Sequence, residues 1–184
     1  MKKAYFLFCL ILASLCLFSL TDCQRNAAET TRTGFYLNTV VSITLYDRPG
    51  EDPLFDEAMS LIGEYDSLLS KTAEGSDIYH INHADGSPVE VDARTAELLS
   101  IALSYSSLSD GLVDPTIGTL SDLWNFGDTN EGIVPSREDI EEALSHIDYT
   151  KVKLSGNTVT LLDPKARLDL GFIAKGYIAD KLKA

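Results

Sequence analysis

One stretch decides how the rest of this chain is interpreted: Arg167-Leu168-Asp169-Leu170-Gly171-Phe172-Ile173-Ala174-Lys175-Gly176-Tyr177. It predicts a short apolar strand that breaks at Gly171 and turns directly into a helix. Such a corner leaves backbone N–H groups free above the strand end, where anions bind. Asp169 and Lys175 add one charge of each sign, so the corner suits a phosphate that is bound together with a metal ion.

The same stretch fits a plainer interpretation, namely an ordinary strand-to-helix corner with a solvated lysine. Short glycine motifs match by chance, so the pattern alone favours this plainer interpretation. The chain also lacks a dinucleotide-binding glycine fingerprint and a phosphate-binding loop with a lysine after its second glycine. Other segments therefore have to decide between the two interpretations.

The first residues predict a secretory leader. Lys2 and Lys3 precede an apolar run over residues 4–20, and polar residues follow at once, which is the layout of a signal peptide. The run is too short and too abruptly ended to favour a membrane span. A leucine three residues before Cys23 resembles the cleavage box of bacterial lipoproteins, although Asp22 stands where that pattern has a small residue.

The leader sets the expected domain organisation. We expect a signal peptide with a candidate lipobox at residues 1–23, a flexible polar tether at 24–33 and one folded domain at 34–184. All three cysteines lie in the leader, so the domain has no internal disulfide and no thiolate metal site. We expect an exported protein that is anchored to the outer face of the cell membrane through a lipid on Cys23.

The composition narrows the class of partner. The chain carries a formal net charge of −13, which argues against nucleic acid and against polybasic adhesion to membranes. An acidic surface still permits a phosphorylated ligand that is held locally by N–H groups and a cation.

Hydrophobic periodicity predicts helices and strands in one domain. Alternation over residues 34–47 predicts a long half-buried strand, and alternation on both sides of 155–157 predicts a hairpin. Helices are expected to begin after four capping residues, Asp52, Ser76, Asp92 and Ser136. The last predicted helix, 173–183, has no glycine cap and no later strand, so we expect the chain to be the front part of a longer protein.

Five segments, taken together in this order, resemble the family of FAD:protein FMN transferases, the ApbE-type lipoproteins. They are Leu37-Asn38-Thr39, Ser76-Asp77-Ile78-Tyr79-His80-Ile81-Asn82, Gly111-Leu112-Val113-Asp114-Pro115-Thr116-Ile117-Gly118, Asp122-Leu123-Trp124-Asn125-Phe126-Gly127 and the stretch from Leu168 to Tyr177. No single segment is specific, whereas the ordered set is. The resemblance implies an α+β fold, a mixed sheet with packed helices built from thymidylate-synthase-like units.

The resemblance also implies an activity. Members of the family bind FAD and Mg²⁺, cleave the pyrophosphate, release AMP and attach FMN to a Thr or Ser of an exported flavoprotein, such as a subunit of a redox pump. Some members hydrolyse FAD to FMN and AMP instead. A third hypothesis is a non-catalytic flavin-binding lipoprotein, because Leu37-Asn38-Thr39 replaces the Met-Gly-Thr that is common in the family.

Particular residues follow from the resemblance by their motif positions. The implied FAD contacts are Leu37, Leu112, Val113, Asp114, Asp169 and Lys175. The implied Mg²⁺ ligand is Phe172, through its backbone carbonyl, because its side chain has no ligand atom; the family's other ligands would lie beyond Ala184. Asp114 also fits a simple turn-forming Asp-Pro pair.

Elementary chemistry is consistent with these roles. A metal would polarise the pyrophosphate, and Lys175 would add a point charge to the same phosphates. The aromatic residues Trp124, Tyr79 and Tyr36 could stack on a flavin or adenine ring, although such positions are more often core. The chain's three histidines, His80, His83 and His146, lack metal-ligand spacing, and we assign no catalytic base.

Overall fold

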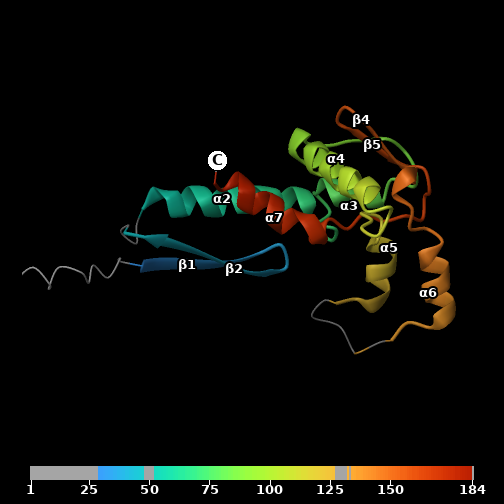
Figure 1. The fold of residues 1–184 in the computed structure, drawn as a ribbon, viewed down its shortest axis with the longest axis horizontal. Coiled ribbons are helices and arrows are strands. Elements are labelled where there is room, and N and C mark those ends of the chain that lie inside the picture. Colours follow the sequence, from blue (N-terminus) through green and yellow to red (C-terminus); the bar gives the residue numbers. More distant parts are fainter. Residues whose placement is uncertain (1–28, 48–51, 127–131, 133, 184) are drawn as a thin grey trace, which may run out of the picture. The chain divides into compact units, whose positions relative to one another are not determined.

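The computed structural model describes residues 29–47, 52–126, 132 and 134–183. Helices and strands alternate along these residues, which confirms the predicted α+β class (Figure 1). The signal peptide, Cys23 and the first part of the predicted tether lie outside the described residues. The elements are β1 (Glu29–Tyr36), β2 (Thr39–Tyr46), α2 (Pro53–Leu69), α3 (Asp77–Asn82), β3 (Val89–Glu90), α4 (Ala93–Leu108), α5 (Gly118–Ser121), η1 (Asp122–Trp124), α6 (Arg137–Leu144), η2 (Tyr149–Lys151), β4 (Val152–Ser155), β5 (Thr158–Leu161) and α7 (Gly171–Lys181).

The chain divides into two compact units. Of the described residues, the smaller contains 29–33, 42–47 and 52, and the larger contains 34–41, 53–126, 132 and 134–183. In the smaller unit the outer ends of β1 and β2 pair, and a hydrogen bond of 2.8 Å joins the hydroxyls of Thr31 and Thr44. Residues 29–33, which we predicted to belong to the tether, are therefore part of a strand.

The single long strand predicted over 34–47 is wrong, because the chain reverses within it. Leu37 and Asn38 both have positive φ, of 52° and 54°, and form a two-residue turn between β1 and β2. Turns of this kind match the twist of a β-hairpin. The alternating pattern continues on both sides of the turn, so the pattern gave no sign of it. The Leu37 N–H donates to Asp66 Oδ1 of α2 at 2.9 Å.

The helices of the larger unit bury apolar stripes around a small sheet. Helix α2 buries Phe55, Ile62, Tyr65 and Leu69. The sheet has the order β3-β5-β4, is antiparallel, and places the buried Val159 opposite both neighbouring strands. The hairpin β4–β5 was predicted. Helix α4 buries Leu98 and Ala102, whereas Tyr105 is 54% and Leu108 81% exposed.

Helices α3, α4 and α6 each begin directly after a residue whose side chain caps the first turn. The hydroxyl of Ser76 accepts the N–H of Tyr79 at 3.1 Å at the start of α3, and the carboxylate of Asp92 accepts the N–H of Arg94 at 2.8 Å at the start of α4. Ser136 caps α6 in the same way. Among the described residues, no helix has the length and apolar character needed to cross a membrane.

The segment before α7 is not the strand that we predicted. Its one ladder contact is an isolated parallel bridge between Arg167 and Ile117, next to α5. The two chains approach closely here because position 118 is a glycine. A Cβ atom at Gly118 would lie 2.5 Å from the carbonyl oxygen of Arg167 and 2.8 Å from its carbonyl carbon. Both of these atoms are backbone, which cannot move aside without moving the segment that leads to α7.

This close approach predicts opposite effects for two glycine-to-alanine substitutions. Gly118→Ala should lower the free energy of unfolding by roughly 2 kcal/mol or more, because the added methyl group overlaps backbone atoms. Gly176→Ala is the matched control: it lies inside α7 with nothing within 4 Å of the added Cβ, and it should raise the free energy by about 0.5–1 kcal/mol. Urea unfolding followed by circular dichroism measures both, and equal effects would contradict the prediction.

Candidate functional site

Helix α7 begins at Gly171, two residues earlier than predicted, and a carboxylate just before it binds its first N–H group. Asp169 Oδ1 accepts the N–H of Gly171 at 2.9 Å. The N–H of Phe172, next along the first turn, has no hydrogen-bond partner among the residues that the structure describes. The corner therefore keeps a free donor at the positive end of the helix dipole, as predicted.

Two distant segments hold the backbone at Leu168 and Asp169. The buried side chain of Asn82 accepts the N–H of Leu168 at 2.6 Å and donates to its carbonyl at 3.0 Å. The N–H of Asp169 donates to the carbonyl of Pro115 at 2.8 Å. Residues 76–82, 111–118 and 168–177, which the sequence singled out separately, thus meet at one point.

A lysine that the sequence analysis missed completes the surroundings of Asp169. The Lys71 ammonium lies 3.0 Å from Asp169 Oδ2 and 2.7 Å from Asp122 Oδ1, and it donates to the hydroxyl of Ser121 at 3.1 Å. Ser121 itself donates to Asp169 Oδ2 at 3.0 Å. Lys71 lies in the loop after α2, 98 positions from Asp169 in sequence, and no local pattern marks it.

These contacts keep both partners charged. Burial by itself raises the pKa of the Asp169 carboxyl, but hydrogen bonds from the Gly171 N–H and the Lys71 ammonium outweigh it, and the net pKa is lowered from 3.8. Burial by itself lowers the pKa of Lys71, but Asp122 and Asp169 raise it by more, so the net pKa is raised from 10.5. The result is a carboxylate and an ammonium in contact at the start of α7.

The carboxylate of Asp114 accepts hydrogen bonds from residues of the fold itself. Oδ1 accepts the N–H and the hydroxyl of Thr116 at 2.8 and 2.6 Å, and Oδ2 accepts the N–H of Tyr149 at 2.8 Å. Three of its acceptor positions are therefore occupied. This geometry agrees with the turn-forming interpretation of the Asp-Pro pair.

One implied FAD contact, Val113, and the implied Mg²⁺ ligand, Phe172, line the same pocket. Val113 and Phe172 border a cavity of about 430 Å³ together with Tyr105 and Tyr177, and its lining is mainly apolar. Leu112, which precedes Val113 in the sequence, is 91% exposed. The pocket could accept the apolar part of a ligand whose polar part reaches the start of α7.

The remaining implied contacts lie apart from that pocket's lining. Lys175 is exposed and makes no ion pair with a described residue, so its ammonium is available to an anion. Leu37 lies in the β1–β2 turn, bonded to Asp66, and not on the pocket wall. Of the aromatic candidates, Tyr79 stacks on His83 with ring centroids 3.9 Å apart, which takes up one of its faces.

The described residues do not by themselves form a magnesium site. No group of three or more His, Cys, Asp or Glu side chains among them could hold a metal ion. Asp169, the nearest carboxylate in sequence to Phe172, is already bonded to the Lys71 ammonium. The carbonyl of Phe172 would be a single oxygen ligand, whereas Mg²⁺ requires six.

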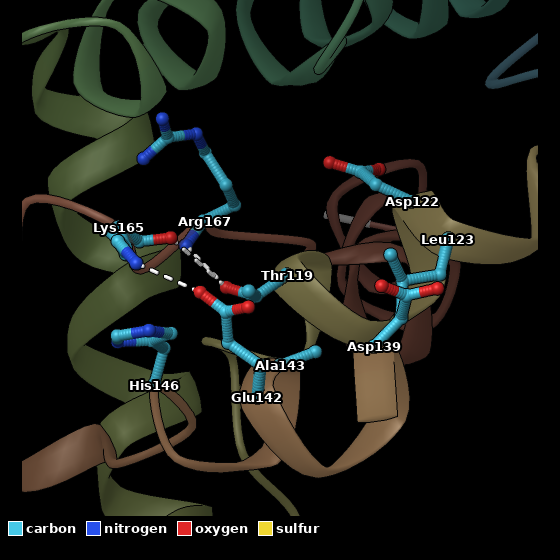
Figure 2. Close-up of a pocket in the computed structure, with 9 residues that line it drawn as sticks. All are labelled: Thr119, Asp122, Leu123, Asp139, Glu142, Ala143, His146, Lys165 and Arg167. Atoms are coloured by element: carbon cyan, nitrogen blue, oxygen red, sulfur yellow. Dashed lines mark hydrogen bonds and ion pairs between the residues drawn. The ribbon is translucent and has the colours of Figure 1, made fainter. Parts of the chain in front are cut away.

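Figure 2 shows a second pocket, of about 310 Å³, beside α5 and α6. Lys165 bonds Glu142 at 2.8 Å, and His146 Nδ1 lies 2.8 Å from Asp163 Oδ2. The guanidinium of Arg167 donates to the carbonyls of Pro164 and Ala166 and makes no ion pair with a described residue. The sequence did not indicate the half-buried pair of His146 and Asp163. None of the residues that line this pocket is an implied FAD contact, so the start of α7 is the better candidate.

Comparison with known proteins shows which family the chain resembles. The model of the ApbE family matches residues 37–184. An FAD:protein FMN transferase of Treponema pallidum (strain Nichols) is 31% identical over 170 residues, which make up 86% of this chain and 47% of that protein.

Solved structures give the same result. The crystal structure of the ApbE protein of Thermotoga maritima aligns with a TM-score of 0.76 and 33% identity, over 84% of this chain and 51% of that one. The flavin transferase ApbE of Vibrio cholerae aligns with a TM-score of 0.75 and 26% identity, over 85% and 52%. The chain thus spans about half the length of the relatives that it matches.

The surroundings of Asp169 predict a pH-dependent effect of Asp169→Asn on stability. Because folding lowers the pKa of this carboxyl from 3.8, its ionised form stabilises the fold above that pH, and the stabilisation is lost as the pH falls below it. The variant should have a lower free energy of unfolding at pH 7, by on the order of 1–2 kcal/mol. The difference should shrink when unfolding is measured near pH 3.

Glu141→Gln serves as the control for this measurement. It removes an exposed i,i+4 ion pair with Arg137, and it should change the free energy of unfolding by less than about 0.5 kcal/mol at pH 7. A difference between wild type and Asp169→Asn that is the same at both pH values would contradict the prediction.

Proposed function

This chain belongs to the ApbE family, and on that basis we propose that the protein transfers FMN from FAD to a Thr or Ser of an acceptor protein and releases AMP. The observation that carries the proposal is the convergence of three family segments on Asp169 at the start of α7. The chain spans 47% of the Treponema pallidum relative, so the proposal concerns the activity of the whole protein.

The described residues suit the binding of a diphosphate. The free N–H of Phe172 and the exposed ammonium of Lys175 are donors for phosphate oxygens near the N-terminus of α7. Asp169 has acceptor capacity left on Oδ1, which suits a hydroxyl of the ribityl chain or ribose. The apolar pocket of Val113 and Phe172 suits a flavin ring.

The transfer itself exchanges the phosphoanhydride bond of FAD for a phosphoester bond to the acceptor. The acceptor hydroxyl oxygen forms a bond to the phosphorus of the FMN moiety, the bond from that phosphorus to the bridging oxygen breaks, and AMP leaves with that oxygen. The hydroxyl loses its proton to solvent water in the same step. The part assigned to this chain is positioning of the diphosphate, and no catalytic base is assigned to it.

Three further elements of the proposal rest on the family resemblance and on the leader. We propose that Mg²⁺ is the cofactor and that the acceptor is exported, such as a flavin-carrying subunit of a redox pump. We also propose that a lipid at Cys23 anchors the protein outside the cell membrane. Magnesium supplies charge stabilisation for a diphosphate when it is bound.

The decisive test is a mass measurement. Whole protein incubated with FAD, Mg²⁺ and an exported flavoprotein domain should add the mass of one FMN to the acceptor, and EDTA should abolish the gain. Absence of any gain with Mg²⁺ present would contradict the proposal. Free FMN and AMP without an acceptor would indicate a pyrophosphatase, and tight FAD binding without turnover would indicate a flavin-binding lipoprotein.

The 184-residue chain on its own should give little or no transfer in the same assay. The described residues contain no group of side chains able to hold a metal ion, and the proposed reaction depends on Mg²⁺. Adding excess Mg²⁺ to the isolated chain should not restore transfer. Turnover by the isolated chain close to that of the whole protein would contradict this expectation.

A further inference from the structure

We infer that Lys71 is a positioning residue for FAD: its ammonium group holds the Asp169 carboxylate so that one acceptor position, on Oδ1, remains for the nucleotide. The inference rests on the proposed function, because it assumes that Asp169 contacts FAD. It adds a residue that lies outside the five segments of the family resemblance and to which neither the sequence analysis nor the comparisons assign a role.

The Lys71 ammonium has no donor left for a ligand. A lysine has three N–H donors, and those of Lys71 are directed to Ser121 Oγ, Asp122 Oδ1 and Asp169 Oδ2 at 3.1, 2.7 and 3.0 Å. Lys175, by contrast, is exposed and makes no ion pair with a described residue. The two lysines therefore differ in role: Lys175 is available to phosphate, whereas Lys71 acts through Asp169.

The loop that carries Lys71 is itself fixed. The hydroxyl of Ser70 accepts the N–H of Ala73 at 3.1 Å. The hydroxyl of Ser76, which caps α3, donates to the carbonyl of Ser70. Because its neighbours are bonded in this way, the position of the ammonium group is set by the loop and not by Asp169 alone.

Counting acceptor positions on Asp169 shows what this contact achieves. Oδ2 accepts from Lys71 and from Ser121, and Oδ1 accepts from the Gly171 N–H. A carboxylate has about four such positions, so one remains, on the oxygen nearest the start of α7. The side chain is 26% exposed, so a ligand can reach it.

Removing the ammonium would undo this arrangement. Asp122 and Asp169 both bond the same ammonium group, and without it two carboxylates of like charge would face each other. Asp169 would keep Ser121 and Gly171 as partners but would lose the cation that fixes Oδ2. The carboxylate would then be held by two hydrogen bonds without an ion pair, and its remaining acceptor position would be held less firmly toward the nucleotide.

A double-mutant cycle on the whole protein tests the inference, with FAD as the probe and quenching of flavin fluorescence as the measurement. Lys71→Met should weaken FAD binding about tenfold in the wild-type background. In the Asp169→Asn background the same substitution should change the Kd less than about twofold, because the group it positions is gone. Lys71→Arg, which keeps the charge and the donors, should recover most of the affinity.

Lys165→Met is the matched control, because it removes an ammonium that is 2.8 Å from a carboxylate but does not contact Asp169; it should leave the Kd unchanged. Unfolding midpoints identify any variant that does not fold. If Lys71→Met is such a variant, Lys71→Gln, which is neutral but keeps a donor, replaces it in the cycle.

Two results would overturn the inference while FAD still binds to the wild type. One is an unchanged Kd in Lys71→Met, and the other is an equal loss of affinity in both backgrounds, which would mean that Lys71 contacts FAD directly or only stabilises the fold. A wild-type protein that binds no FAD would instead refute the proposed function itself.

Discussion

The arrangement of this site depends on one side chain that takes the place of a missing strand. Leu168 is buried in a segment that has one isolated bridge and no continuous sheet ladder. Its N–H and carbonyl would cost free energy if they were left unpaired there. The amide of Asn82 satisfies both, and so fixes the backbone one residue before Asp169. The direction in which α7 leaves the core, and the place where its N-terminal N–H groups are free, follow from that pair of hydrogen bonds.

The positive and negative side chains around this fixed backbone nearly balance one another. The ammonium of Lys71 serves two carboxylates at once, and the hydroxyl of Ser121 joins the same group. The consequence is a site that is nearly neutral within a chain whose formal net charge is −13. An anionic ligand would otherwise be repelled by such a chain. Local neutralisation, a helix N-terminus and the exposed Lys175 together make it physically reasonable for an acidic protein to bind a diphosphate.

The sequence was sufficient wherever the deciding interactions are local. Ser76, Asp92 and Ser136 cap helices through bonds to residues two or three positions away, and all three were predicted. The β4–β5 hairpin was predicted for the same reason. The turn at Leu37 was missed because the apolar alternation continues across it. Lys71 could not be found, since its partners are 50 to 98 positions away and a single lysine in a polar loop carries no periodic signal.

Asp114 shows how a correctly recognised segment can act through atoms other than those expected. The resemblance implies a contact between its carboxylate and FAD, yet that carboxylate binds Thr116 and Tyr149 within the fold. What the segment supplies to the site is backbone: the carbonyl of Pro115, which accepts the Asp169 N–H, and the bare Cα of Gly118, which lets residues 167–168 approach. If Asp114 also touches a ligand, only its one remaining acceptor position is available. Its main effect on binding would then be indirect, through the geometry of the loop that aligns Asp169.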